Sequence, residues 1–324
     1  MRRTRPVVGI SLGDVSGIGP EVTAAALALP AVRRALTPVV YGDGPTLARF
    51  AEFEHYARRE AGAQGRAAGP TCIAVTQLAE KDRGPGKPRR AGGRAQYAFI
   101  DAAIQAAKRG ELDALCTAPV SKEQISRAGI PFMGHTEVLA AAFGVEVMML
   151  MDGPRVRVAL ATNHVPISAL PALLTADRLV SQLRLLSRSL EGPLARKPRL
   201  AVLSLNPHAG EGGLLGREEV EVIAPAIARA RALRIDAHGP FAADGYFANL
   251  PMMKRHDAVL AMFHDQGLIA AKALDFERTV NVTLGLPVPR TSPDHGTAYD
   301  LAGTGRASAV PMREALLKAA LLAR

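Results

Sequence analysis

Short runs of Val, Ile and Leu alternate along the chain with longer stretches in which apolar residues recur every three or four positions. The short runs have the length of buried strands, and the longer stretches have the period of amphipathic helices. This alternation predicts the α/β class, with largely parallel sheets covered by helices. The predicted strands are residues 7–12, 38–42, 71–75, 113–117, 146–151, 156–161, 199–205, 257–263 and 279–284. The predicted helices are residues 20–30, 45–58, 95–109, 121–128, 136–143, 168–190, 217–233, 246–254 and 312–323.

Three of the apolar runs lead into a histidine: VRVALATNH reaches His164, RLAVLSLNPH reaches His208 and DAVLAMFH reaches His264. Because the carboxyl ends of parallel strands meet at one edge of a sheet, these side chains could converge. Neutral imidazoles suit Zn²⁺, Co²⁺ and related divalent ions, and three protein ligands with an open position are typical of a catalytic metal site. The histidines are far apart in sequence, so no local metal-binding motif supports this hypothesis.

Two glycine-rich loops follow predicted strands. GISLGDVSGIGPEV, residues 9–22, reads as a strand, a turn and a helix, and fits an anion-binding loop about as well as a plain connection. It lacks the G-x-G-x-x-G fingerprint of standard dinucleotide-binding folds. In the loop at 206–219, the backbone amides of one short run could hold the phosphates of a cofactor; its residues are Gly210, Glu211, Gly212 and Gly213.

Other polar residues have the chemistry to hold an anionic substrate. His135 and Thr136 precede a predicted helix and could donate to an anionic oxygen. Lys272 and Arg290 supply positive charge, and Asn281 supplies an amide. These groups favour a phosphorylated or carboxylated small molecule.

Composition narrows the classes of partner. The 324 residues suffice for about two domains, and we place an approximate boundary between lobes of residues 1–140 and 141–324, one of which could be discontinuous. The net charge of +10 comes from scattered arginines and aromatic residues make up 4%, so we expect no nucleic-acid partner. No apolar run reaches the roughly 18 residues of a membrane span. Cys72 and Cys116 lie in apolar runs, which favours reduced thiols and a cytoplasmic location.

Taken together, the runs GDxxGIGPE, GHTE, GPFAADGYF, NPHAGEGG, HDQG and RTSPDHGTA resemble the 4-hydroxythreonine-4-phosphate dehydrogenase family of pyridoxal phosphate biosynthesis. The similarity extends from about residue 7 to residue 310 in the family's order. It implies two α/β/α lobes with a cleft between them, as in isocitrate and isopropylmalate dehydrogenases. It also implies a homodimer, a divalent metal (Zn²⁺, Co²⁺ or Mg²⁺) and NAD.

The resemblance also assigns residues. It implies that His164 and His208 bind the metal together with His264 contributed by the partner subunit. Lys272 and Asp265 are the nearest candidates for proton handling or for orienting the metal ligands, and the sequence alone does not assign the base. The matching substrate-binding residues are His135, Thr136, Lys272, Asn281 and Arg290.

The implied reaction is NAD-dependent oxidation of 4-phosphohydroxy-L-threonine to 2-amino-3-oxo-4-phosphobutanoate, which decarboxylates to 3-amino-2-oxopropyl phosphate. Two departures leave the ligands intact but keep the choice of substrate open: Val15-Ser16 replaces the commoner Pro-Ala, and Phe263 stands where Tyr is frequent. Related dehydrogenases act on 4-phosphoerythronate, phosphothreonate or aromatic dihydrodiols. A three-histidine zinc hydrolase and a basic binding protein are the alternatives from other classes.

Overall fold

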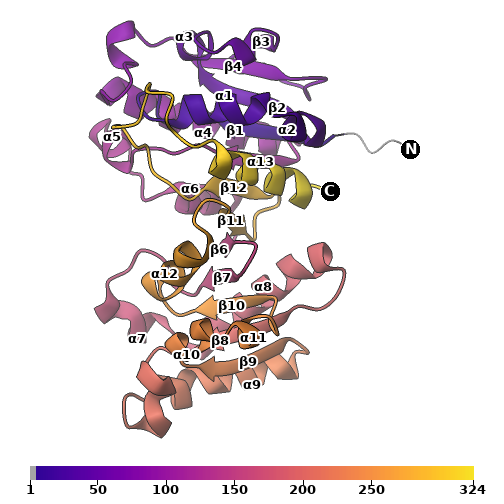
Figure 1. Cartoon of the computed structure of the whole chain (residues 1–324), viewed down its shortest axis with the longest axis vertical. Helices are drawn as coiled ribbons and strands as arrows, with labels where there is room; N and C mark the ends of the chain where they lie inside the picture. Colours follow the sequence, from indigo (N-terminus) through magenta and orange to yellow (C-terminus); the bar gives the residue numbers. More distant parts are fainter. Residues whose placement is uncertain (1–4) are drawn as a thin grey trace. The chain divides into compact units, whose positions relative to one another are not determined.

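The computed structural model describes residues 5–324, which form two compact units (Figure 1). The first unit comprises the chain up to Glu146 together with Val280–Val282 and Leu286–Arg324, and the second comprises Val147–Thr279 and Thr283–Gly285. The C-terminal segment therefore returns to the first unit. As a consequence, Asn281 and Arg290 belong to the first unit rather than to a continuous second lobe beginning at residue 141.

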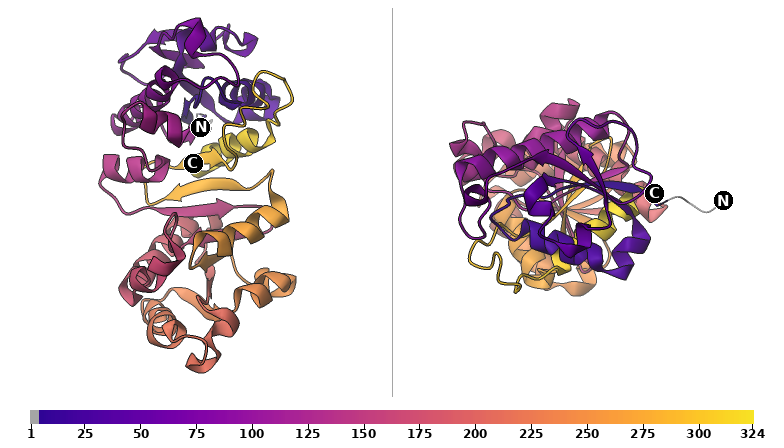
Figure 2. Two further views of the ribbon diagram at one scale, coloured as in Figure 1. Left: turned by 90° about the vertical axis from the view of Figure 1, so that its left-hand side faces the viewer. Right: turned by 90° about the horizontal axis from the view of Figure 1, so that it is seen from above.

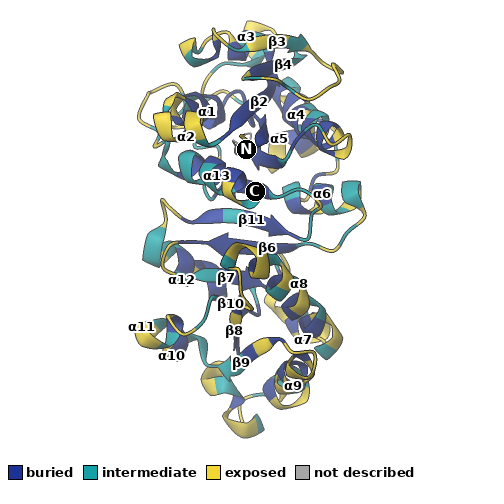
Figure 3. Ribbon diagram, turned by 90° about the vertical axis from the view of Figure 1, so that its right-hand side faces the viewer, coloured by how far each residue is buried: buried dark blue, intermediate teal, exposed yellow. Residues whose placement is uncertain are grey.

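The first unit is built on a parallel sheet in the order β3-β4-β2-β1-β5-β12. Helices α1, α2 and α13 cover one face, and α4, α5 and α6 cover the other (Figure 3). The strands are β1 (Val7–Ser11), β2 (Thr37–Asp43), β3 (Ala57–Glu60), β4 (Thr71–Thr76), β5 (Ala114–Thr117) and β12 (Arg290–Pro293). The helices are α1 (Gly19–Ala28), α2 (Pro30–Ala35), α3 (Gly44–Leu47), α4 (Arg90–Lys108), α5 (Lys122–Arg127), α6 (His135–Phe143) and α13 (Val310–Leu322).

The second unit has the strand order β6-β7-β10-β8-β9, in which only β6 is antiparallel to its neighbour. Helices lie on both sides of the strands in this unit as well (Figure 2). The strands are β6 (Met148–Asp152), β7 (Arg157–Leu160), β8 (Arg199–Leu203), β9 (Asp236–Phe241) and β10 (Ala258–Ala261). The helices are α7 (Leu170–Leu173), α8 (Ala176–Leu194), α9 (Ala224–Ala232), α10 (Ala243–Ala248), α11 (Leu250–Met253) and α12 (His264–Asp275). Strand β11 (Val280–Leu284) is divided between the two units.

Burial explains why the strands read as continuous apolar runs. Every residue of β1, β2, β5, β6 and β10 is buried (Figure 3). A strand covered by helices on both faces has no solvent-facing positions, so polar residues do not alternate with apolar ones. The prediction of an α/β protein with largely parallel sheets is confirmed. Within the described part of the chain, no helix combines the length and apolar content of a membrane span.

Every strand expected from the sequence is present, but the helix expected at residues 45–58 is wrong. That segment holds the short helix α3, a 3₁₀ turn at Ala51–Phe53 and the edge strand β3. The Asp43 carboxylate caps α3 by accepting from the amide of Thr46 at 3.0 Å, and Phe50 is extended, which stops helical continuation. Other elements gave no recognised signal: α2 follows directly on the expected helix at 20–30, β9 and β12 carry too few aliphatic residues, and α12 begins with the polar residues of HDQG.

Helix α5 is held against α4 by a close backbone approach. A Cβ atom on Gly93 of α4 would lie 2.1 Å from the carbonyl oxygen of Gln124 in α5, which is well inside van der Waals contact. The side chain of Gln96, one turn further along α4, accepts from the amide of Ser121 at 2.8 Å. Glycine at position 93 is therefore required by packing rather than by its backbone angles.

We predict that Gly93→Ala destabilises the protein by about 2 kcal/mol or more, because the new methyl group must push backbone apart. The matched control is Gly245→Ala in α10, where a Cβ meets nothing within 4 Å and no proline follows. In a helix that change should be neutral or stabilising by up to about 1 kcal/mol. Urea unfolding of both variants measures the difference, and equal effects would contradict the packing role of Gly93.

Candidate functional site

The three strands that precede the histidines are neighbours in the second unit. Strand β10 lies between β7 and β8 and is parallel to both, with Val259 paired to Val158 on one side and to Ala201 on the other. The chain leaves β7 toward His164, β8 toward His208 and β10 toward His264. The three histidine-bearing segments therefore start from the same edge of one sheet.

Two of the three imidazoles lie side by side within one chain. The ring centroids of His164 and His264 are 5.3 Å apart, with the ring planes inclined by 41°. The Asp265 carboxylate lies 2.7 Å from Nδ1 of His264 and can accept its proton, so that Nε2 keeps its lone pair for a ligand. In residues 5–324, no three His, Cys, Asp or Glu side chains of the single chain gather closely enough to hold a metal ion.

The other residues of HDQG connect the ends of the strands. Gln266 accepts from the amide of Met262 at 2.7 Å, and its side-chain NH₂ donates to the carbonyl oxygen of Ser204 at 2.7 Å. One side chain thus joins the end of β10 to the end of β8. A Cβ on Gly267 would lie 2.6 Å from Cγ1 of Val158, so glycine allows α12 to pack directly on β7.

His208 lies in a left-handed stretch of backbone. Five consecutive residues have positive φ, from 45° to 75°. Three of the five are not glycine, and each such residue costs roughly 1–2 kcal/mol relative to a right-handed conformation. Surrounding contacts must therefore hold this loop. The five residues are His208, Ala209, Gly210, Glu211 and Gly212.

The carboxylate of Glu219 supplies those contacts. This side chain is 3% exposed, and its Oε1 accepts from the amides of Leu205 at 2.7 Å and Asn206 at 2.8 Å. Its Oε2 accepts from the side-chain NH₂ of Asn206 at 2.9 Å, which also donates to Glu218. A Cβ on Gly210 would lie 2.6 Å from Oε2 of Glu219, so this glycine is explained by packing against the carboxylate. Glu219 therefore determines where the His208 loop leaves the sheet.

The glycine-rich loop after β1 also owes its glycines to packing. Added Cβ atoms on Gly13, Gly17 and Gly19 would lie between 2.3 and 2.8 Å from carbonyl oxygens. The buried Asp14 carboxylate accepts from the hydroxyl of Tyr299 at 2.6 Å, and its burial raises the pKa of Asp14. These contacts join the loop to the C-terminal segment, which favours the structural interpretation of residues 9–22.

In the first unit, the strand ends hold a buried cation. Arg290, in β12, is 3% exposed, and its guanidinium donates to Oγ1 of Thr117 at the end of β5 from Nε at 3.1 Å and from Nη2 at 2.5 Å. Burial lowers the pKa of Arg290 to about 10, although the charges of Cys116 and Glu137 raise it in part. The group is thus still charged at neutral pH, in surroundings where an anionic ligand would be bound strongly.

His135 lies beside this cation at the start of α6. Burial holds the pKa of His135 well below its usual value, and the charges of Arg290 and Lys122 lower it further. The imidazole is therefore neutral, and its Nε2 is buried without a hydrogen-bond partner among the described residues. The same holds for Oδ1 of Asn281 and Nε2 of His295. A buried polar atom without a protein partner is satisfied by water or by a ligand, so these three atoms are available to a ligand that enters here.

The remaining candidates lie as follows. Thr136 is buried next to His135, and Lys272 lies in the second unit on α12, with Nζ 5.6 Å from the ring centroid of Phe276. Glu211, Gly212 and Gly213 lie in the left-handed loop or directly after it. The sequence interpretation missed Thr117, Gln266 and Glu219 as residues that hold the site together. Gln266 and Glu219 lie within quoted motifs, but nothing in the sequence singles out Thr117.

We predict that Glu219→Gln destabilises the protein by about 2 kcal/mol or more. An amide in place of the carboxylate weakens two backbone contacts and faces the NH₂ of Asn206, and hydrogen bonds to charged groups are worth about 1.5–3 kcal/mol each. Glu218→Gln is the control, because Glu218 also accepts from the Asn206 NH₂ but not from the amides of Leu205 and Asn206, and it should change stability by about 1 kcal/mol or less. Hydrogen exchange of residues 205–216 should rise in the first variant only. Equal exchange in both variants would show that Glu219 does not hold the loop.

Comparison with known proteins identifies the family. The model of the family described as "Pyridoxal phosphate biosynthetic protein PdxA" matches residues 34–319. The 4-hydroxythreonine-4-phosphate dehydrogenase of Geobacter metallireducens is 46% identical over 100% of this chain and 97% of its own. A Symbiobacterium thermophilum protein, provisionally named D-threonate 4-phosphate dehydrogenase, is 40% identical over 97% of this chain and 95% of its own.

A solved structure agrees with these matches. The crystal structure of 4-hydroxythreonine-4-phosphate dehydrogenase from Klebsiella pneumoniae superposes with a TM-score of 0.82, at 33% identity over 98% of this chain and 100% of that one. The family expected from the sequence motifs is confirmed, and this chain belongs to the PdxA family of pyridoxal phosphate biosynthetic proteins.

Proposed function

We propose that the chain is an NAD-dependent 4-hydroxythreonine-4-phosphate dehydrogenase. The observation that carries this proposal is the buried cationic site of the first unit, where Arg290 lies beside a neutral His135 with an unpartnered nitrogen. Such a site suits a phosphorylated amino acid better than a neutral substrate. The full-length similarity to the Geobacter metallireducens dehydrogenase supports the same substrate.

The substrate is held by charge-assisted hydrogen bonds. Arg290 donates to an anionic oxygen of the substrate, and His135 and Thr136 complete the site at the start of α6. Lys272 and Asn281 are the further substrate-binding groups that we carry over from the family's motif. The neutral state of His135 matters, because a neutral imidazole can either donate to a phosphate oxygen or accept from an ammonium group.

The reaction oxidises the C3 hydroxyl of 4-phosphohydroxy-L-threonine. The hydride leaves C3 for NAD⁺, the hydroxyl proton goes to a base, and the product is 2-amino-3-oxo-4-phosphobutanoate. The bond to its carboxylate then breaks, which releases CO₂, and protonation of the resulting enolate gives 3-amino-2-oxopropyl phosphate. Because Asp265 already binds Nδ1 of His264, we assign it to positioning, and Lys272 to proton handling.

His164 and His208, with His264 from the partner subunit, are the proposed metal ligands. Neutral imidazoles suit Zn²⁺ or Co²⁺ better than Mg²⁺, which prefers oxygen ligands. The Asp265 carboxylate, 2.7 Å from Nδ1 of His264, leaves Nε2 of that ring available as a donor. When bound, such an ion lowers the pKa of a hydroxyl that it contacts. For the phosphates of NAD we propose the backbone of Gly210, Glu211, Gly212 and Gly213.

A homodimer and a cytoplasmic location complete the proposal. Large apolar side chains are exposed near the histidine-bearing segments: Ile167 is 75% exposed, Leu214 is 83% exposed and Ile269, on α12, is 70% exposed. Exposed apolar side chains near a site are typical of surfaces that another subunit covers. Cys72 and Cys116 are both free and buried, which suits a reducing compartment.

A substrate panel tests the proposal. Purified protein is incubated with NAD⁺ or NADP⁺ and each of 4-phosphohydroxy-L-threonine, D-threonate 4-phosphate, 4-phosphoerythronate and an aromatic dihydrodiol, while nicotinamide absorbance and metal content are measured. The proposal requires the highest kcat/KM for 4-phosphohydroxy-L-threonine with NAD⁺. A higher kcat/KM for another member of the panel would show that the protein is a related dehydrogenase with that substrate. Hydrolysis without reduction of the cofactor would instead indicate a zinc hydrolase.

We predict that Arg290→Gln lowers kcat/KM for the phosphorylated substrate by about 100-fold or more, because charge-assisted hydrogen bonds worth about 1.5–3 kcal/mol each are lost. A dephosphorylated analogue should lose less than about fivefold if Arg290 binds phosphate. Lys272→Ala, measured on the same pair of substrates, tests whether Lys272 binds phosphate. Equal losses on both substrates for both variants would exclude a phosphate role.

A mixing experiment tests the shared metal site. His164→Ala and His264→Ala should each be inactive, but a mixed dimer carries both lesions in one site and leaves the other intact. Random mixing gives about half mixed dimers, so about a quarter of the wild-type activity should return. Because the two rings are neighbours within one chain, the alternative is that His264 serves its own chain. In that case every site keeps a lesion, and no activity returns although subunits exchange.

A further inference from the structure

A depression in the second unit lies away from the strand edge that carries the histidines. It has a volume of about 440 Å³ and is formed by the C-terminal half of α8, the connection from α8 to β8 and the connection from α9 to β9. Strands β8 and β9 are parallel and both begin here, whereas His208 follows the opposite end of β8. The depression is thus at the amino-terminal edge of these strands. Its lining residues are Arg184, Ser187, Arg188, Glu191, Lys197, Leu233, Arg234 and Ile235.

The lining is strongly positive. Four cationic side chains face one carboxylate, that of Glu191. Arg184 and Arg188 are separated by one turn of α8, where like charges repel. Arg234 has a φ of 61°, which is unfavourable for a residue other than glycine.

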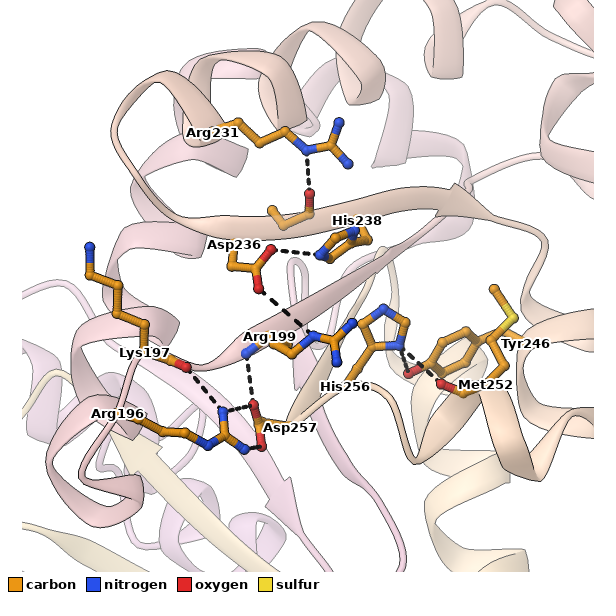
Figure 4. A network of polar contacts seen from close by, with 11 residues as sticks. Arg196, Lys197, Arg199, Arg231, Asp236, His238, Tyr246, Met252, His256 and Asp257 are labelled. Atoms are coloured by element: carbon orange, nitrogen blue, oxygen red, sulfur yellow. Dashed lines mark hydrogen bonds and ion pairs between the residues drawn. The ribbon is translucent and has the colours of Figure 1, made fainter.

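The cationic side chains that line this depression make no hydrogen bonds or ion pairs with the described residues, whereas neighbouring arginines do. Figure 4 shows Arg196 bound to Asp257 through two hydrogen bonds of 2.8 and 2.7 Å, and Arg199 paired with Asp236 at 3.8 Å. Lys197 lies between these two arginines in sequence, yet its ammonium group makes no hydrogen bond or ion pair with any residue of 5–324. In the described part of the chain, the side chains of Arg184, Arg188 and Arg234 likewise make no hydrogen bond or ion pair.

We propose that this depression binds a small polyanion that carries two or more phosphate groups. Guanidinium groups bind phosphate through paired hydrogen bonds, and several arginines around one concave surface favour a multiply charged ligand. The volume is that of a small-molecule site. No aromatic side chain lines the depression, so it offers no stacking platform for the bases of single-stranded nucleic acid. The site is separate from the substrate site at Arg290, and the proposal does not rest on the catalytic function.

Calorimetric titration with inorganic tripolyphosphate, at about 0.15 M salt to screen diffuse attraction, tests the proposal. Wild-type protein should bind it, and the double variant Arg184→Gln/Arg188→Gln should raise Kd by about tenfold or more, because two charge-assisted contacts are lost. The matched control is Arg127→Gln/Arg229→Gln. It removes the same net charge from two exposed arginines that pair with Glu123 and Asp177, and should stay within about twofold of wild type.

Two further titrations establish where the anion binds and what kind of anion the depression prefers. Arg290→Ala should keep the tripolyphosphate binding that depends on Arg184 and Arg188, and loss of binding in that variant alone would place the anion at the substrate site and overturn the proposal. Equal weakening in both double variants would overturn it too, because it would show diffuse attraction. The second titration uses a short single-stranded RNA. If it binds more tightly than tripolyphosphate and its binding needs Arg184 and Arg188, the ligand is a nucleic acid and the proposal of a small polyanion is wrong.

Discussion

The parallel pairing of β7, β10 and β8 is the constraint on which the candidate metal site depends. Parallel strands bring residues that are far apart in sequence to one edge, but the ladder ends there and leaves backbone groups to be satisfied. Gln266 satisfies two of them at once, the amide of Met262 and the carbonyl of Ser204. His264, two residues earlier in the chain, is therefore fixed relative to the sheet rather than carried on a free loop.

The candidate site residues of the two units are held in their states by different physical effects. In the first unit, burial lowers the pKa of His135, so its imidazole is neutral. Burial also places the Arg290 guanidinium in surroundings of low dielectric constant, where it attracts an anion strongly. In the second unit, the histidines are more accessible and the cost is conformational, because His208 lies in a left-handed loop. The hydrogen bonds of Glu219 offset that cost. Removing the Glu219 carboxylate would thus lower the stability of the protein, whereas removing the Arg290 cation would weaken ligand binding.

The sequence predicted the class, the buried strands and the three strand-end histidines, because each rests on a local pattern. It did not reveal β12, whose residues Arg290–Pro293 are buried yet polar, since only the tertiary structure makes that segment a strand. It also could not separate the glycines that serve packing, such as Gly13 and Gly267, from those that would serve a ligand. Residues that act through a single long-range contact, such as Thr117 with Arg290, leave no periodic signal.

The return of the C-terminal segment to the first unit has a consequence for biosynthesis. Strand β12 pairs with β5, and α13 packs against that part of the sheet, so the first unit lacks a strand and a covering helix until residues 286–324 have been made. The second unit is almost continuous in sequence and has all five of its own strands earlier. Proteins of several domains usually complete the N-terminal domain first on the ribosome. We expect the reverse order in this chain: the unit whose first strands are translated first must wait, with the edge of β5 unpaired, for residues 286–324, which follow the whole of the second unit.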